Sequence, residues 1–163
     1  MIPTLAGMDA AVIFKQLDDY RSGKRQWGVM GAIAKALSTQ DTADVASYFA
    51  TQENGLPTLS GSRVPEAGRS LREADPATRL IFAGNPQRAI APCAACHGPG
   101  SFKIGAPALE GQQADYIERQ LASFAEDICQ NDIYEQIRAI AKALTPDEMH
   151  ALATSYATRG NNR

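Results

Sequence analysis

Two cysteines three positions apart, Cys93 and Cys96, are followed directly by a histidine, His97. On one helical turn two such thiols can each add across a vinyl group of the same haem, and the adjacent imidazole then projects towards the iron. The macrocycle becomes part of the hydrophobic core, so a chain with this run has to fold around it. The run therefore predicts a covalently attached haem c, with His97 as the proximal iron ligand.

The same residue types allow two other kinds of site. A pair of cysteines at this spacing occurs in thioredoxin-like redox proteins, but that fold needs a βαβ pattern, which the sequence does not show. A zinc site is arithmetically possible, because four suitable ligands are present: Cys93, Cys96, Cys129 and His150. The spacing between these ligands is irregular, and His97 would have no role in such a site.

Composition and charge exclude several classes of protein. The 163 residues are enough for one domain or two small ones. Sixteen basic and eighteen acidic residues give a net charge of -2, which leaves no electrostatic case for wrapping nucleic acid. With 44 % hydrophobic and 21 % charged residues, the chain is globular rather than disordered. No uncharged stretch is long enough to span a membrane, and the first five residues do not form a secretory signal.

Hydrophobic residues recur with the helical period and no convincing alternating pattern appears, so the expected fold class is all-α. The clearest apolar stripes run through these residues: Ile13, Leu17 and Tyr20, then Ile117, Leu121, Phe124 and Ile128. Helix starts are expected at Ser38–Asp41, at Asp75 and at Thr145–Glu148, because each resembles a capping sequence. The helix that begins at Asp75 is expected to end by Gly84.

Two parts of the chain are related by an internal repeat. The run Ile33–Leu37 recurs unchanged as Ile140–Leu144, at an offset of 107 residues. The loop Pro3–Gly7 resembles Pro107–Gly111 at an offset of 104 residues. The second copy therefore carries three extra residues near 128–131.

The repeat and a Gly- and Ser-rich stretch divide the chain. We expect a partial unit at 1–54, a linker at 55–74 and a complete haem-binding unit at 75–163. The second copy extends backwards from its loop through the Cys-x-x-Cys-His run, whereas the first unit has no counterpart of that segment. One explanation is that the chain is a fragment and that upstream residues carry a signal peptide and a first attachment run. The protein would then be a dihaem carrier.

With these residues in view, the chain resembles the class I c-type cytochromes, and more narrowly their two-domain, dihaem c-four type. The matching segments are 79–84, 91–99, 105–112, Tyr116, 120–121, Phe124, 131–132 and 140–145. The resemblance implies a class I cytochrome c fold of two related units, the first incomplete.

The resemblance also implies roles for individual residues. Cys93 and Cys96 would be the thioether anchors and His97 the proximal ligand. Pro107 would lie against the imidazole, with its carbonyl accepting the ring N–H and so fixing the tautomer. Leu109 would pack on the macrocycle. Read without the haem, Pro107 and Leu109 are an ordinary loop proline and core leucine, and both readings predict that they are buried.

The sixth iron ligand is where the sequence departs from the family. Members normally supply a methionine three residues before the Ile-Ala pair of the third helix, and this position is Met30 in the first unit but Ile137 in the second. Without a haem in its own unit, Met30 is expected to fill the core beside Ile33 and Leu37. The substitutes in the second unit are Met149, His150, Cys129 and Tyr134. We expect Met149 in the core and His150 on the surface, keep Cys129 and Tyr134 as weak candidates, and favour water or no ligand.

Covalent haem attachment occurs outside the bacterial cytoplasm, so the resemblance implies a periplasmic electron-transfer protein. Its expected partners are redox proteins, such as periplasmic or membrane-bound oxidases and reductases, with no nucleic acid and no membrane insertion. One alternative is a haem-based binder or sensor of nitric oxide, carbon monoxide or peroxide. Another is a structural subunit of a redox assembly that docks through its first unit. With two histidines in the chain, no Ser-His-Asp set is worth proposing, and we expect no enzyme.

Overall fold

The computed structural model describes residues 2–53, 71, 73–98 and 105–159. Its α-helices are α1 (Ala10–Ser22), α2 (Gly28–Ala36), α3 (Thr39–Thr51), α4 (Pro76–Phe82), α5 (Ala94–His97), α6 (Ala114–Ala125), α7 (Gln136–Ala143) and α8 (Pro146–Arg159). Two short 3₁₀ turns, η1 (Pro86–Arg88) and η2 (Ile133–Glu135), complete the set. In these ranges the extended pairing amounts to one isolated bridge, between Asn85 and Ile90. The prediction of an all-α fold is therefore confirmed.

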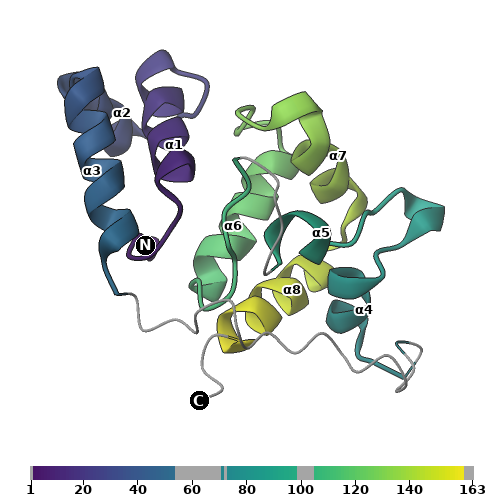
Figure 1. Ribbon diagram of the computed structural model, residues 1–163. Coiled ribbons are helices and arrows are strands. Elements are labelled where there is room, and N and C mark those ends of the chain that lie inside the picture. The colour runs from purple at the N-terminus through teal and green to yellow at the C-terminus, as the bar shows by residue number, and fades with distance from the viewer. Residues whose placement is uncertain (1, 54–70, 72, 99–104, 160–163) are drawn as a thin grey trace.

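The helices form two groups, α1 to α3 and α4 to α8 (Figure 1). Each group has its own hydrophobic cluster, the first around Ile13 and Leu17 and the second around Ile81 and Leu152. The predicted linker at 55–74 lies outside the described residues, apart from Leu71, Glu73 and Ala74. The two clusters agree with the predicted pair of units, and the boundaries of those units stay predictions.

The sequence repeat is also a repeat of backbone geometry. Gly7 and Gly111 end the two related loops with φ of 70° and 73°, in the left-handed region that glycine tolerates. The Gly7 N–H donates to the carbonyl of Phe49 at 2.8 Å, and the Gly111 N–H donates to that of Tyr156 at 2.9 Å. Each loop is thus tied to the last helix of its own group at equivalent positions.

All three predicted helix starts are present. Ser38 and Asp41 form a complete capping box at the start of α3. Thr145 and Glu148 exchange side chain to backbone hydrogen bonds in the same way at the start of α8. The Asp75 side chain accepts from the Thr78 N–H at the start of α4, where Pro76 occupies the first helical position.

Two expectations about the apolar stripes are wrong. Ile128 lies outside α6 and is 54 % exposed, because the helix ends at Ala125 and Asp127 turns the chain with a φ of 57°. Ile33 is 48 % exposed, so it does not fill the core beside Met30. Met30 itself packs against the first cluster, as predicted. Periodicity alone found the stripes but not the point at which each one leaves the core.

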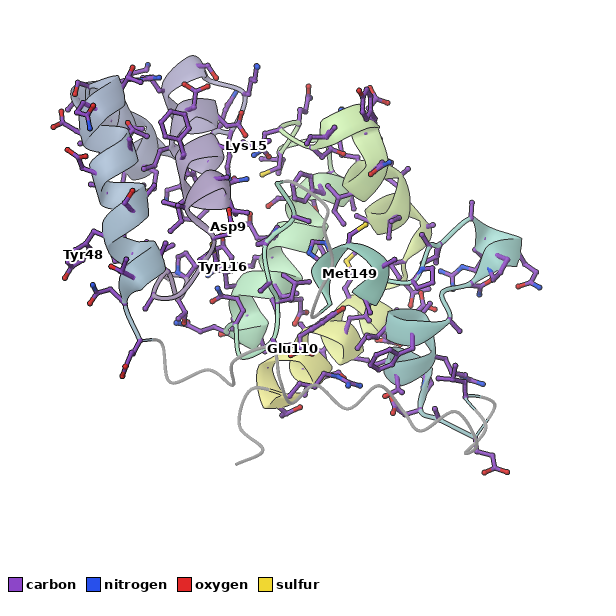
Figure 2. All side chains as sticks on the ribbon, in the orientation of Figure 1. Asp9, Lys15, Tyr48, Glu110, Tyr116 and Met149 are labelled. Carbon is purple, nitrogen blue, oxygen red and sulfur yellow. The ribbon has the colours of Figure 1, made fainter. Side chains whose placement is uncertain are left out.

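A buried polar network centred on Arg25, which is 8 % exposed, joins the two groups of helices. The guanidinium donates to Gln16 Oε1 at 2.6 Å, to the Tyr116 hydroxyl at 2.9 Å and to Gln120 Oε1. It also lies over the ring of Tyr20, 4.7 Å from its centroid. Tyr116 lies on α6 where that helix faces α1 (Figure 2). Neutral oxygens and an aromatic face, rather than a carboxylate, make these four contacts to the charge.

The network continues through Asn131. Its amide donates to Gln16 Oε1 at 3.0 Å and to Asp19 Oδ2 at 2.9 Å. Lys15 reaches from α1 to the same place, pairing with Asp19 Oδ2 at 2.5 Å and donating to the Asn131 carbonyl at 2.7 Å (Figure 2). Because Asn131 and Asp19 are buried, the hydrogen bonds of the Asn131 amide and of Lys15 stabilise the contact between the two groups.

The two related loops meet beside this network. The Gln112 side chain accepts from the Thr4 N–H at 2.9 Å and donates to the Thr4 carbonyl at 3.0 Å. The next side chain, Gln113, donates to the Ile2 carbonyl at 2.9 Å. These three hydrogen bonds connect the start of the described chain to the C-terminal group of helices.

Replacing Arg25 with alanine would remove the guanidinium that donates to Gln120 Oε1 and to the Tyr116 hydroxyl at a buried contact. It would leave Gln16 Oε1 with the Asn131 amide as donor. Hydrogen bonds to charged groups contribute roughly 1.5–3 kcal/mol, so we expect Arg25→Ala to lower the free energy of unfolding by about 2–3 kcal/mol in urea unfolding. The matched control is Arg21→Ala, which removes an exposed ion pair with Asp18 and should change stability by less than about 0.5 kcal/mol. Equal effects of the two substitutions would contradict the role given to Arg25.

Candidate haem-attachment site

The three residues of the predicted attachment run share one helical turn. Cys93 caps the N-terminus of α5, and its carbonyl accepts the N–H groups of Cys96 at 3.2 Å and His97 at 2.9 Å. The intervals of three and four residues place both thiols and the imidazole on one side of this turn. All three side chains are half-buried. Folding thus brings the two predicted anchors and the predicted ligand together on one turn.

The imidazole of His97 is oriented by a backbone carbonyl. Nδ1 lies 2.7 Å from the Pro107 oxygen. A carbonyl can only accept, so the neutral ring carries its proton on Nδ1 and its lone pair on Nε2. This is the tautomer that an iron ligand would need, and the carbonyl partner would raise the basicity of Nε2 as a ligand. The predicted contact between His97 and Pro107 is present.

Pro107 and Leu109 differ from the prediction in their burial. Both are half-buried rather than buried. Leu109 packs against the second cluster together with Leu121 and Ile140, and each of the three stays partly exposed. Apolar side chains that touch a core but still face outwards suit a flat apolar group that would cover them.

A buried tyrosine lies next to the first anchor. Burial raises the pKa of the Cys93 thiol to about 11. Burial, followed by the nearby Cys93 thiol, also raises the pKa of Tyr156. The Tyr156 hydroxyl is among the buried polar atoms that have no hydrogen bond of good geometry. The sequence analysis missed Tyr156. Its position 107 residues after Phe49, the offset of the repeat, is the signal that could have found it.

The chain approaches α5 through a tight turn. Asn85 and Ile90 exchange backbone hydrogen bonds of 2.7 and 2.9 Å, and the Cys93 N–H points to the Leu80 carbonyl at 3.4 Å. At the start of this turn Gly84 has a φ of 67°. A Cβ at Gly84 would lie 2.3 Å from the Ile90 carbonyl oxygen. The turn that positions Cys93 thus requires glycine at 84.

Arg88 fixes the far side of the same turn. Its guanidinium forms a two-pronged ion pair with Glu148, at 2.6 and 2.8 Å, and donates to the carbonyl of Ala143. The turn before α5 is thereby tied to the end of α7 and the start of α8. Hydrogen bonds from Arg88 are the main cause that lowers the pKa of Glu148 to about 2.

Both alternative readings of the cysteines are wrong for the described structure. The thioredoxin-like reading needs a sheet, and the described residues contain the isolated bridge but no strand. The zinc reading needs a cluster of ligands, and the described part of the chain brings no three cysteine, histidine or carboxylate side chains together in a way that would hold a metal ion. Cys129 and His150 therefore do not join the run at α5.

Three of the possible sixth ligands have other surroundings. Met149 is buried in the second cluster, as predicted. His150 is on the surface, as predicted, where Nδ1 lies 2.9 Å from a Glu118 carboxylate oxygen. Tyr134 is 88 % exposed. It lies in η2 with a φ of 57°, directly before Glu135 with a φ of 59°.

Cys129 is buried at the contact between the two groups of helices. The N–H of Cys129 donates to the Ser123 carbonyl at 3.0 Å. Burial raises the pKa of its thiol, and the neighbouring Arg25 acts in the opposite direction. The described surroundings of Cys129 are thus those of the interface network, on the side of Arg25.

Comparison with known proteins gives relatives over nearly the whole chain. The chain is 37 % identical to the thiosulfate dehydrogenase electron acceptor of Stutzerimonas stutzeri (strain A1501), with 97 % of this chain and 71 % of the relative aligned. It is 31 % identical to cytochrome c4 of Pseudomonas aeruginosa, with 93 % and 73 % aligned. The chain belongs to the cytochrome c4 family. No family model matches it.

Solved structures of cytochrome c4 have the same fold. Reduced cytochrome c4 from Pseudomonas stutzeri superposes with a TM-score of 0.76 at 28 % identity, covering 97 % of this chain and 84 % of that one. A thiosulfate dehydrogenase from Marichromatium purpuratum superposes with a TM-score of 0.75 at 31 % identity, covering 96 % of this chain and 32 % of that one. The class I cytochrome c fold is thus confirmed.

Membership of the cytochrome c4 family settles the class of activity. Members are electron-transfer proteins that carry covalently bound haem c and belong to the periplasm, so this chain is an electron-transfer haem protein. The comparisons do not support the sensor alternative. Among the described helices, none combines the length and the apolar character that crossing a membrane would need.

The residues at α5 of this chain fit a covalently attached haem c. Two thiols and an imidazole held by a carbonyl share one turn, half-buried apolar side chains pack on the same cluster as Cys93, and the Tyr156 hydroxyl beside Cys93 lacks a well-formed partner. This donor set matches what covalent attachment and axial ligation require.

The turn at Gly84 can be tested by a pair of glycine substitutions. Gly84→Ala combines a left-handed φ with a clash against backbone atoms, so we expect it to lower the free energy of unfolding by roughly 2–4 kcal/mol. Gly31→Ala is the control, because its Cβ meets nothing within 4 Å and it lies inside α2. There alanine should stabilise by about 0.5–1 kcal/mol. A neutral effect at Gly84 would contradict the described turn.

The ion pair between Arg88 and Glu148 predicts a pH dependence. Because folding lowers the pKa of Glu148 from 4.5 to about 2, the pair stabilises the protein above pH 4.5, and this stability is lost as the pH falls towards 2. Glu148→Gln should therefore unfold at lower temperature than the wild type near neutral pH, with the difference shrinking below pH 4.5. Asp147→Asn, one residue earlier, controls for the change in net charge. A difference that stays constant with pH would contradict this account.

Proposed function

We propose that the chain carries one haem c on Cys93 and Cys96, with His97 as the proximal iron ligand, and passes electrons between redox proteins of the periplasm. The observation that supports this site most directly is the 2.7 Å contact between His97 Nδ1 and the Pro107 carbonyl. It sets the tautomer and direction of the imidazole before any iron is bound.

The bound haem supplies the one-electron chemistry, and the chain supplies position and environment. Pro107 orients the ligand and strengthens it as an electron donor. The half-buried side chains of Leu109, Leu121 and Ile140 provide apolar surroundings, which favour the less charged state of the centre. No bond to a substrate is made or broken by side chains in this function.

We propose that the electron donor is a periplasmic oxidoreductase of the thiosulfate dehydrogenase type. The support is the name of one relative, a thiosulfate dehydrogenase electron acceptor, and the structural likeness to a part of a thiosulfate dehydrogenase. A carrier of this kind meets its partners through small, short-lived interfaces. The near-neutral charge of -2 means that steering by overall charge is weak.

Haem attachment is tested by expression in a bacterium with cytochrome c maturation proteins. We expect one haem per chain, resistant to acid–acetone extraction, and loss of that resistance when Cys93→Ser and Cys96→Ser are combined. His97→Ala should lose the proximal ligand, which the ferric spectrum reports. Cys129→Ser is the matched control, because Cys129 lies at the interface network, and it should keep the haem. Attached haem in the double variant would overturn the assignment.

The donor is tested by mixing the oxidised cytochrome with thiosulfate dehydrogenase and thiosulfate and following reduction by absorbance. We expect reduction at a rate that saturates with enzyme, against no reduction by thiosulfate alone. Dithionite serves as the control for a competent haem. Reduction by dithionite without reduction by the enzyme would overturn the proposed donor and leave the haem assignment standing.

A further inference from the structure

We propose that α7 gives the haem iron of this chain no sixth ligand, so that the position opposite His97 is left to solvent water or to a small exogenous molecule. This inference rests on the proposed attachment of haem at Cys93, Cys96 and His97. It concerns the coordination of the iron and leaves the electron-transfer role unchanged.

The argument begins with the register of two equivalent helices, α2 and α7. Ala34 and Ala141 are their most buried residues, at 1 % and 0 % exposure. Both helices end at a leucine with extended backbone, Leu37 with φ and ψ of -84° and 135° and Leu144 with -82° and 143°. The repeated sequence thus occupies the same register in both helices, at an offset of 107 residues.

In this register Ile137 on α7 is the counterpart of Met30 on α2. Each lies four residues before the buried alanine of its helix. Met30 carries a thioether, which is a haem ligand in c-type cytochromes. Ile137 is half-buried and has no atom with a lone pair. The substitution therefore removes a donor from the place where the repeat has one.

Three of the described candidates for a sixth ligand have surroundings other than an iron site. Met149 packs inside the second cluster, and His150 pairs with Glu118 on the surface. Tyr134 points into solvent from η2.

Cys129 is held by the contact between the two groups of helices. Its thiol is buried beside the guanidinium of Arg25, and its N–H is bonded to the Ser123 carbonyl. Moving Cys129 towards an iron would disturb the network through which Arg25 joins α1 to α6. The described residues thus favour an iron with one protein ligand.

The ligand class follows from the chemistry of such an iron. A five-coordinate or water-bound ferrous haem binds a neutral diatomic molecule, and carbon monoxide is the probe. A methionine ligand raises the reduction potential of a haem, so its loss should lower the potential relative to a methionine-ligated relative.

The experiment uses the purified holoprotein and three readouts. We expect one haem per chain, a high-spin ferric spectrum, and a ferrous spectrum that shifts when carbon monoxide is added. A low-spin spectrum that carbon monoxide leaves unchanged would overturn the inference, because it requires a strong sixth ligand from the protein. Absence of haem would instead overturn the proposed function, so the two failures are distinguishable.

A variant that adds a ligand tests the role of position 137 separately from the spectra of the wild-type protein. Ile137→Met restores the side chain that the repeat has at Met30, and we expect it to convert the ferric spectrum to low spin, to weaken binding of carbon monoxide by at least tenfold and to raise the potential. Ile128→Met is the control, because it adds a thioether at an exposed position outside α7. A shift to low spin in both variants, or in neither, would contradict the assigned role of position 137.

Discussion

The contact between the His97 imidazole and the Pro107 carbonyl is the constraint on which the functional site depends. It joins the single helical turn of α5 to a loop ten residues later, and it determines which ring nitrogen has the lone pair. The loop can offer its carbonyl there because Gly111 turns the chain and bonds to Tyr156 on α8. The same helix places the Tyr156 hydroxyl beside Cys93, so the core, the loop and the attachment turn hold one another in place.

The repeat explains how two groups of helices form one interface. Arg25 and Cys129 occupy equivalent positions, since the N–H of each donates across six residues at 3.0 Å, to Asp19 and Ser123 respectively. These equivalent residues also lie next to each other. The two equivalent positions thus meet at the contact between the two groups of helices. The guanidinium of Arg25 can lie beside the Cys129 thiol. Two guanidinium groups at the same two positions would repel each other.

The two units have diverged at matching places. Within the given sequence, α2 has Met30 where α7 has Ile137, and the predicted attachment run lies at α5. At the end of α6, Asp127 holds a left-handed φ where Gly23 holds one after α1. The extra residues that follow lead into η2, with left-handed backbone at Tyr134 and Glu135. A left-handed backbone conformation is costly for residues with a Cβ, and here it occurs just before α7, the helix that carries Ile137.

Local chemistry determined much of this protein from sequence alone. The helices, their capping boxes, the repeat and the attachment run follow from sequence patterns, and folding preserved them. The carbonyl expected at Pro107 was implied by the resemblance to class I c-type cytochromes, and the contact is present. The half-burial of Leu109, the exposure of Ile33 and Ile128, and the surroundings of Cys129 were not predictable, because they depend on which surfaces meet. Periodicity says that a helix has an apolar face; packing decides where that face stops. Only the tertiary structure brought Arg25 to Gln120 and Tyr156 to Cys93, since both pairs join segments that no local pattern connects.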